Sequence, residues 1–406
     1  MGESSSRDQT TETSNSSFFT EDEVRNLKSE YETGGMEKAK LLIQRKINDL
    51  ENTELNIAVT GESGTGKSTF INAMRGLDKD DDGAAETRTT EGTMEPTGYR
   101  HPTLPNVCLW DLPGVGTPKF PASKYQKEMK FDKYDFFIII SGCRFTENDV
   151  KLAKDIKRLE KNSYFVRSKI DNDLHAKRKE GRDFNEEKEL EKIRNYCIRN
   201  LQEAGIQSPR VFLISSFDQN RYDFNLLNKA LEGDLPGIKK SIYILSLPNL
   251  NLEIVERKKK ELKKQVWMLA SLSGVVGAVP VPGVSLGCDI AILIRVIIDF
   301  RKYMGLDDDS LQRLAKMAGK PVGDLKAVVN SPLVGKITPD IINRLAWGTA
   351  AIFISGLEIA LDIIPVVGSI FGAGSSFLMT YKLLTGVLDD LTVNAKRVVK
   401  AAFGTD

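Results

Sequence analysis

The sequence predicts an α/β domain with a mainly parallel sheet, joined to a domain made of helices alone. Three observations lead to this expectation. A glycine-rich turn at residues 61–68 lies between a short apolar run and a helical pattern. From about residue 54 to residue 235, strand patterns alternate with helix patterns, as they do in parallel sheets with helical crossovers. After Pro236 the strand patterns stop and long helical patterns follow.

Five short runs have the apolar and β-branched character of buried strands. They are Leu55–Thr60, Val107–Asp111, Phe136–Ser141, and residues 164–167 and 211–215. A helix is expected over residues 68–75, directly after the glycine-rich turn. A longer amphipathic pattern predicts a helix over residues 186–204, with Gly205 at its carboxyl end as a C-cap. Together these segments form the expected α/β layer structure.

The chain divides into four regions. Residues 1–17 are polar and rich in Ser and Thr, which is typical of a disordered tail. Residues 18–50 have helical periodicity that begins at a capping box, Thr20 to Glu23. Residues 51–237 contain the alternating pattern, and residues 238–406 are expected to be helical. Length alone is consistent with two or three domains.

Composition argues against several classes of function. The formal net charge is +1 over 406 residues, so no global field indicates a nucleic-acid partner. The four cysteines (Cys108, Cys143, Cys197 and Cys288) are far apart and form no metal-binding spacing with the two histidines. We therefore expect buried free thiols in a reducing compartment. The first 20 residues lack the apolar stretch of a secretory signal.

Three features raise the question of membranes. Residues 1–6 match the pattern for myristoylation of Gly2, although one such chain gives only marginal membrane binding. Residues 250–264 are strongly basic, and we interpret them as a solvated helix face, with attraction to anionic lipid as the alternative. Residues 266–288 and 363–380 are uncharged and broken by Pro and Gly. A buried helical hairpin, a shallow membrane insertion and a membrane span remain open for these two segments.

The turn at residues 61–68 fits the phosphate-binding pattern GxxxxGK[ST]. Its glycines let backbone N–H groups approach phosphate oxygens, and the following helix presents its positive end. Lys67 is expected at the β- and γ-phosphates, and the Ser68 hydroxyl at Mg²⁺. The expected nucleotide contacts in this loop are Gly61, Glu62, Ser63, Gly64, Thr65, Gly66, Lys67, Ser68 and Thr69.

Two further segments predict a metal and γ-phosphate site. Asp111 ends a predicted strand and begins a DxxG motif, so its carboxylate is expected to hold Mg²⁺ and the Gly114 N–H to approach the γ-phosphate. The stretch at residues 83–96 contains four threonines, of which one is expected to sense Mg²⁺ and the γ-phosphate. We favour Thr87 among them.

A third motif predicts that the base is guanine. Residues 168–171 read Ser-Lys-Ile-Asp, close to the pattern [NT]KxD. Asp171 can accept hydrogen bonds from the N1–H and 2-amino groups of guanine, which adenine lacks, and Lys169 can lie along the base. A backbone N–H at Ser215 or Ser216 is expected to reach the guanine O6. The sequence therefore predicts GTP and GDP as ligands. A P-loop ATPase is the alternative, and equal affinity for GTP and ATP would contradict the assignment of Asp171 to guanine.

The residue after the DxxG motif predicts slow catalysis. Many small GTPases have a Gln there that orients the attacking water, but here the residue is Val115. We expect Lys67 and Gly114 to contribute from this chain, and a further catalytic group to come from Glu91 or from a second subunit. The alternative is a GTP-dependent scaffold with negligible turnover.

Five runs together resemble the interferon-inducible immunity-related GTPases, over roughly residues 20–320. The runs cover residues 60–72, 110–116, 130–141, 164–171 and 246–249. With a lysine at position 67, the phosphate-binding loop resembles that of the effector-type members of the family.

The resemblance implies a Ras-like P-loop GTPase domain and one helical domain formed by both chain ends. It also implies a homo-oligomer that forms in the GTP state, with Glu91 acting across a dimer. A cytoplasmic protein with partial, peripheral association to intracellular membranes, including vacuoles that enclose pathogens, is expected on the same ground.

Overall fold

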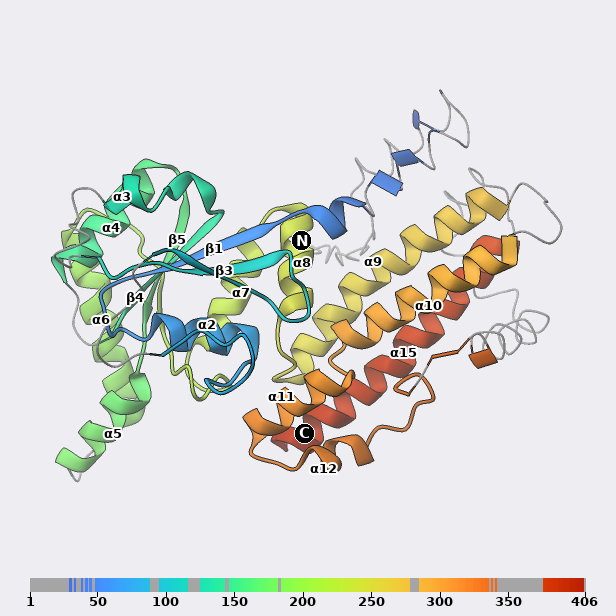
Figure 1. Cartoon of the computed structure of the whole chain (residues 1–406). Helices are drawn as coiled ribbons and strands as arrows, with labels where there is room; N and C mark the ends of the chain where they lie inside the picture. The colour runs from blue at the N-terminus through green and yellow to red at the C-terminus, as the bar shows by residue number, and fades with distance from the viewer. Residues whose placement is uncertain are drawn as a thin grey trace, which may run out of the picture.

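The computed structural model describes residues 51–87, 95–115, 125–142, 146–181, 184–277, 285–335, 337–338, 340–341 and 375–404, with scattered helical residues between 29 and 50 (Figure 1). The expected tail at residues 1–17, Gly2, Glu91 and most of the segment 363–380 lie outside the described residues. The same holds for most of residues 18–50, so a helical domain built from both chain ends stays a prediction.

The α/β domain is built on a six-stranded sheet with the strand order β2-β3-β1-β4-β5-β6. Its strands are β1 (Leu55–Thr60), β2 (Thr97–Arg100), β3 (Val107–Asp111), β4 (Phe136–Ser141), β5 (Asn162–Arg167) and β6 (Val211–Leu213). Every neighbouring pair is parallel except β2–β3. Strands β2 and β3 lie on one side of β1, and β4, β5 and β6 lie on the other, so the strand order reverses beside β1. In open α/β sheets, ligands bind at such a point, beyond the carboxyl ends of the strands.

The predicted strands are confirmed, and one strand is new. β5 begins two residues before the predicted run, and β6 ends two residues before it. The sequence analysis did not predict β2, an antiparallel edge strand of four largely exposed residues. At Gly98 a Cβ atom would lie 2.9 Å from the Trp110 ring. The strand therefore depends on glycine for its close approach to β3, and glycine is not a residue that signals a strand.

Helices cover both faces of the sheet (Figure 1). They are α2 (Lys67–Arg75), α3 (Tyr125–Glu128), α4 (Glu147–Arg158), α5 (Ile170–Glu180), α6 (Glu186–Glu203), α7 (Phe224–Asp234) and α8 (Gly237–Ser246). The C-cap of α6 is Ala204, one residue before the predicted Gly205, which follows it with φ +89° and an N–H that donates to the Gln202 carbonyl. Each face of the sheet has its own buried core, since alternate residues of β1 point to opposite sides.

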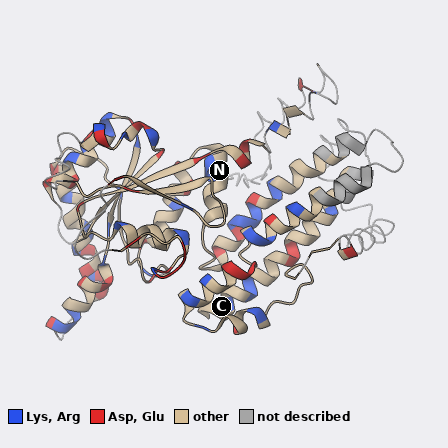
Figure 2. Cartoon of the chain, in the orientation of Figure 1, with Lys and Arg blue, Asp and Glu red and all other residues tan. Residues whose placement is uncertain are grey.

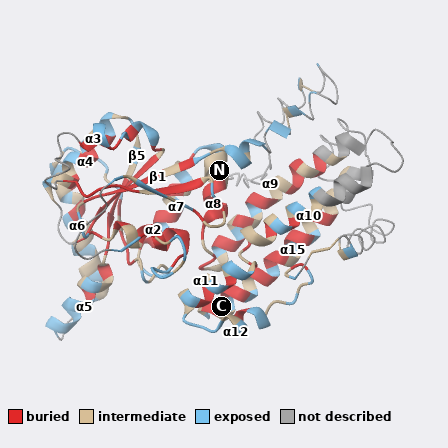
Figure 3. Ribbon diagram, in the orientation of Figure 1, coloured by how far each residue is buried: buried red, intermediate tan, exposed pale blue. Residues whose placement is uncertain are grey.

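The helical domain continues one of these two cores. It contains α9 (Leu252–Gly277), α10 (Ser285–Tyr303), α11 (Asp308–Ala318), α12 (Val322–Ala327) and α15 (Ser375–Phe403). Figure 1 shows α9, α10 and α15 running side by side, and Figure 3 shows their buried faces turned inward. Leu55 of β1, Phe224 of α7, Leu262 of α9 and Leu391 of α15 belong to one continuous cluster. The two domains therefore share buried apolar surface instead of meeting only at a linker.

The uncharged segment at residues 266–288 enters this core where it is described. Val266, Trp267, Met268 and Ala270 are buried on α9. Within the part of the chain that the structure describes, no helix is both long and apolar enough to cross a membrane.

The interpretation of the basic run as a solvated face is wrong for three of its six cations. Lys258 is only 3 % exposed and donates to the Tyr303 carbonyl at 2.8 Å. Arg257 pairs with Glu232 at 2.6 Å and Lys259 pairs with Asp389 at 2.8 Å. These three cations of α9 thus bind groups on α7, α10 and α15. Figure 2 shows that residues of both charges lie along the helical domain. Sequence spacing could not reveal these partners, because they come from distant parts of the chain.

The cysteines agree with the sequence analysis where they are described. Cys108 and Cys197 are buried free thiols, and burial raises the pKa of Cys197 to about 11. Among the described residues, no group of three or more His, Cys, Asp or Glu side chains is placed to hold a metal ion. Cys143 and the side chain of Cys288 lie outside the described part.

Candidate nucleotide-binding site

The glycine-rich loop links β1 to α2 at the carboxyl edge of the sheet. Gly61, Gly64 and Gly66 have φ values of +140°, +76° and +95°, which favour glycine. A Cβ atom on Gly61 would lie 2.1 Å from the Ile140 carbonyl oxygen of β4, so no other residue fits there. Gly66 is the N-cap of α2, which begins at Lys67, one residue earlier than predicted. This geometry lets backbone N–H groups of the loop face an anion at the helix N-terminus.

The Lys67 side chain lies inside the loop and is only 7 % exposed. Its Nζ donates to the Glu62 carbonyl at 2.9 Å and to the Gly61 carbonyl at 3.4 Å. Burial lowers the pKa of Lys67, and the nearby carboxylates of Asp111 and Glu62 oppose that shift. The ammonium group is therefore held at the position where a phosphate chain would lie, with only backbone carbonyls to release.

Ser68 and Asp111 meet as the metal-site prediction requires. The Ser68 hydroxyl donates to Asp111 Oδ2 at 2.5 Å. Asp111 is buried at the end of β3, and the parallel register places it beside Val59 at the end of β1. A hydroxyl and a carboxylate are hard oxygen ligands of the kind that Mg²⁺ takes, so this pair fits the metal. Thr69 follows, half-buried, on α2.

The other expected metal contact is not brought into this group. Thr87 is exposed and is the last described residue before the segment 88–94, which contains Glu91. Within the described residues no hydrogen bond joins Thr87 to Ser68 or Asp111. The assignments of Thr87 and Glu91 remain predictions.

The DxxG turn is fastened to the phosphate loop. Leu112 N–H donates to the Val59 carbonyl, and Val115 N–H donates to the Gly61 carbonyl at 3.3 Å. A Cβ atom on Gly114 would lie 2.8 Å from the backbone nitrogen of Ser63, so the two loops touch. Val115 itself is buried in the core on that face of the sheet. The side chain that follows Gly114 is therefore packed in a core and has no polar atom to offer an attacking water.

Tyr125 holds this turn, and the sequence analysis did not single it out. Its hydroxyl donates to the Pro113 carbonyl at 2.6 Å and lies 2.9 Å from the Thr60 hydroxyl. The ring is buried, and burial raises the pKa of Tyr125. Only the tertiary structure brings Tyr125 under the loop, since nothing in its neighbouring residues marks it.

Residues 168–171, which we call the base-recognition motif after their predicted role, are also bonded to the phosphate loop. Lys169 has φ +60° and donates from Nζ to the Gly64 carbonyl at 2.7 Å. The buried Ser168 hydroxyl lies 2.6 Å from the Thr65 carbonyl and 3.2 Å from the Ser141 carbonyl, and it donates to one of them at a time. The serine that departs from the [NT]KxD pattern thus supplies the bond that joins β5 to the loop. Asp171 lies half-buried in the first turn of α5.

A buried arginine positions that first turn. Arg167, at the end of β5, donates to the Ser168 carbonyl at 2.6 Å and to the Gly142 carbonyl, and its guanidinium pairs with Asp173. Burial raises the pKa of Asp173, and Arg167 opposes that shift. Asp171 precedes Asp173 by two residues, so the same bond fixes its helix turn. A charged residue closing an otherwise apolar strand was the only sequence signal.

The two serines after β6 differ in role. Ser215 is buried, and its hydroxyl accepts hydrogen bonds from Phe217 N–H at 3.2 Å and Asp218 N–H at 3.3 Å. Ser215 therefore shapes the turn, while Ser216 is half-buried beside it. The Ile170 N–H donates to the Ile214 carbonyl at 3.2 Å, which holds this turn next to the base-recognition motif.

Glu62 borders an open cavity on the side of the loop that faces α4. Thr146 and Asp149 form a capping box at the start of α4, and Asn148 donates to the Glu62 carboxylate at 3.0 Å. Burial raises the pKa of Asp149 to about 6. Residues 61–66 are thus supported from four segments: β4, the DxxG turn, the α4 cap and the base-recognition motif.

Comparison with known proteins agrees with this geometry. The chain matches the model of the family Interferon-inducible GTPase (IIGP) over residues 20–402. The chain belongs to the interferon-inducible GTPase family. The match extends past residue 320, where the resemblance found in the sequence alone ended, and includes α15.

Curated relatives support the same assignment. The chain is 41% identical over 389 residues to Interferon-inducible GTPase 5 of Rattus norvegicus, which covers 94% of this chain and 82% of that protein. It is 37% identical to Interferon-gamma-inducible GTPase 10 of Mus musculus, over 95% of this chain and 90% of that protein.

Among solved structures, a GDP·AlF4⁻-bound NFeoB of S. thermophilus matches at 10% identity and TM-score 0.29, covering 83% of this chain and 99% of that chain.

Proposed function

We propose that this interferon-inducible GTPase family member binds GTP and GDP with Mg²⁺ in the loop at residues 61–68. It hydrolyses GTP slowly alone, and it assembles with copies of itself in the GTP state. One observation carries the proposal. Asp111 is hydrogen-bonded to Ser68, the last residue of this loop. On the other side, Ser168 and Lys169 are hydrogen-bonded to backbone carbonyls of the same loop. Phosphate, metal and base elements therefore surround one binding place.

The protein groups divide the work of binding. Lys67 exchanges its two carbonyl partners for phosphate oxygens, so little movement is needed on binding. Ser68 and Asp111 would hold Mg²⁺, which when bound neutralises charge on the phosphate oxygens. Asp171 accepts hydrogen bonds from guanine, and the alkyl stem of Lys169 lies along the base. Because Asp171 is held by the turn that Arg167 fastens, base selection depends on a rigid element.

Catalysis is the incomplete part of this site. The residue after Gly114 is the buried Val115, which has no polar atom in its side chain to orient water. We infer that Glu91, from the same chain or from a second copy, supplies the missing group in the assembled GTP state. The family membership and the names of the relatives support a role in interferon-induced immunity. We extend this to action at intracellular or pathogen-containing membranes, reached from the cytoplasm by peripheral contact.

The decisive measurement is GTP hydrolysis at several protein concentrations. We expect the specific activity to rise with concentration, and light scattering to grow with GTP but not with GDP. Lys67→Ala should abolish both, whereas the exposed Lys192→Ala should change neither. A specific activity that does not change with concentration would contradict completion of the site by assembly. No multiple-turnover phosphate release at high concentration would favour the scaffold, which the burial of Val115 keeps as the second candidate.

The membrane part of the proposal needs its own test. After fractionation of cells that express the protein, we expect a part of it in the membrane pellet, and carbonate extraction should release that part. Retention in the pellet after carbonate would contradict peripheral contact. Complete absence from membranes would contradict the membrane role and would leave the nucleotide proposal unaffected.

A further inference from the structure

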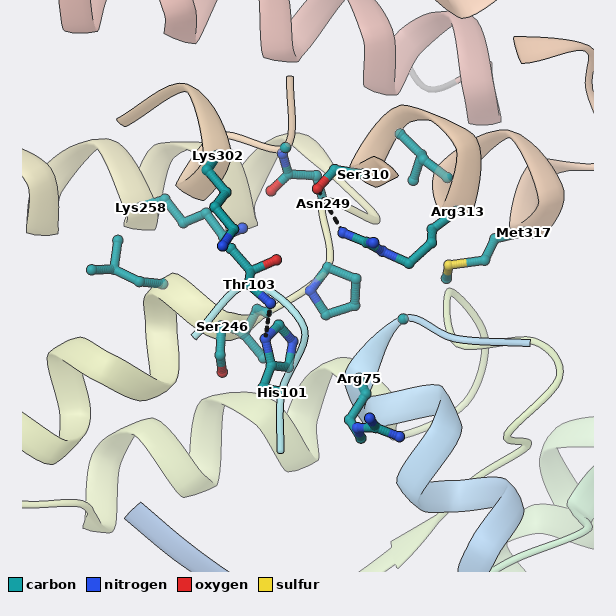
Figure 4. A pocket seen from close by; sticks show the side chains of 16 residues that line it. Arg75, His101, Thr103, Ser246, Asn249, Lys258, Lys302, Ser310, Arg313 and Met317 are labelled. Carbon is teal, nitrogen blue, oxygen red and sulfur yellow. Dashed lines mark hydrogen bonds between the residues drawn. The ribbon is translucent and has the colours of Figure 1, made fainter. Parts of the chain in front are cut away.

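A second, smaller cavity lies where the α/β domain meets the helical domain (Figure 4). One wall comes from the end of α2 and from the turn between β2 and β3. The other walls come from the α8–α9 connection and from α9, α10 and α11. The polar side chains that line it are Arg75, His101, Thr103, Ser246, Asn249, Lys258, Lys302, Ser310 and Arg313. The nucleotide site uses none of these residues.

The lining of this junction cavity is strongly positive. Arg75, Lys258, Lys302 and Arg313 are among its residues, and no Asp or Glu is. His101 is buried between them, and its Nδ1 accepts hydrogen bonds from Thr103 N–H at 3.2 Å and Leu104 N–H at 3.3 Å. Burial lowers the pKa of His101 well below its usual value, and each of the four surrounding cations lowers it further. The imidazole is therefore neutral, so the positive charge of the lining comes from Arg75, Lys258, Lys302 and Arg313.

Three of these cations have no ion-pair partner in the described residues. Within 4.0 Å of the side-chain nitrogens of Lys258, Lys302 and Arg313, the described part of the chain places no carboxylate oxygen. Among the described residues, the Lys258 ammonium donates to the Tyr303 carbonyl alone, and the Arg313 guanidinium donates to the Ser310 hydroxyl alone, at 2.8 Å. Arg75 differs, because it already binds the Gly83 and Arg100 carbonyls.

Carboxylates act on the cavity only from outside its lining. Asp307 raises the pKa of Lys258, but burial outweighs it and lowers that pKa to about 7. Burial raises the pKa of Asp81, but Lys316 and Arg313 outweigh this effect and lower that pKa. Burial also raises the pKa of Asp299, and Lys302 is one of the cations that oppose the shift. Lys258 is buried without a paired anion among the described residues, which is unfavourable, and a bound anion would offset that cost.

We propose that the junction cavity binds a tetrahedral oxyanion of the size of inorganic phosphate, held by Lys258, Lys302 and Arg313. The cavity volume of about 50 Å³ is several times the roughly 10–15 Å³ that one water needs, so it admits such an ion but not a nucleotide. Arg75 and His101 belong to the α/β domain, and the three binding cations belong to the helical domain. The helical domain would therefore hold the anion against the wall that Arg75 and His101 form on the α/β domain.

The test measures phosphate binding while the nucleotide site is filled. The protein is loaded with GDP and Mg²⁺, so that the loop at residues 61–68 is occupied, and dialysed against radioactive phosphate at constant ionic strength in chloride. We expect one phosphate per chain with wild type. Lys302→Ala/Arg313→Ala should bind phosphate at least about tenfold more weakly, since charge-assisted bonds are the strong ones. The matched control Lys188→Ala/Lys192→Ala removes the same charge from the exposed face of α6 and should bind like wild type.

Each outcome decides the proposal. No binding by wild type at millimolar phosphate, or equal binding by the Lys302→Ala/Arg313→Ala protein, would overturn it. Lys302→Gln keeps a polar side chain and tests a single contact, so it should give an intermediate loss with an unchanged circular dichroism spectrum. A lipid headgroup carries the same phosphate chemistry. Vesicles containing a phosphoinositide should not displace the radioactive phosphate; displacement would overturn the inferred size limit.

Discussion

Lys258 is the best place to test the energetics of the junction between the two domains. It is nearly fully buried, its Nζ has a backbone carbonyl as hydrogen-bond partner, and no ion pair compensates its charge among the described residues. The substitution Lys258→Met keeps an unbranched apolar side chain that is one atom shorter, while it removes the charge. We expect this variant to show a weaker dependence of stability on pH than wild type.

The magnitude follows from the pKa of Lys258. Burial lowers that pKa from 10.5 to about 7. Between these two values the unfolded chain binds more protons than the folded one, so stability rises with pH. From pH 7 to pH 9 the free energy of unfolding of wild type should gain about 2 kcal/mol that the Met variant does not gain. His101 does not contribute in this window, because its pKa lies below the usual 6.5 in the folded protein.

The assay is urea unfolding followed by circular dichroism at pH 7 and pH 9. Both proteins carry saturating GDP, and the buffers contain chloride but no phosphate. Other titrating groups, such as the buried thiols and tyrosines, are the same in both proteins, so the difference between the two pH profiles isolates Lys258. Parallel profiles would refute the reasoning, since they would mean that Lys258 has an ordinary pKa in the folded protein.

Three further predictions concern the nucleotide site. Tyr125→Phe should lower the free energy of unfolding by roughly 1–3 kcal/mol in urea titrations, because the Pro113 carbonyl loses its buried donor; an unchanged midpoint would contradict this. Asp171→Asn should weaken GTP binding by roughly 10- to 100-fold in fluorescence titrations, the loss expected for charged hydrogen bonds, and leave ATP binding unchanged. Ser68→Ala should reduce the difference between GDP affinities measured with Mg²⁺ and with a chelator, and a preserved difference would remove Ser68 and Asp111 from the metal site.

Several features of the site depended on contacts that sequence patterns do not record. Arg167 closes an apolar strand and Tyr125 lies in an unremarkable stretch, yet both fasten loops of the nucleotide site. For the basic run on α9, by contrast, the sequence pattern led to a prediction that was wrong. Its spacing is that of a solvated face, but Lys258 is buried because α10 and α15 pack over it. Such partners lie tens to hundreds of residues away, so local periodicity cannot identify them.

The sequence by itself determined the phosphate loop, five of the six strands to within two residues or better at each end, and the family. These features are encoded in contiguous residues, because a glycine-rich turn needs particular backbone angles and a buried strand needs an apolar run. Only the tertiary structure decided how the base motif, the metal pair and the DxxG turn meet at that loop. It also decided that four cations converge at the domain junction, since packing energy and charge placement there depend on segments that are distant in the chain.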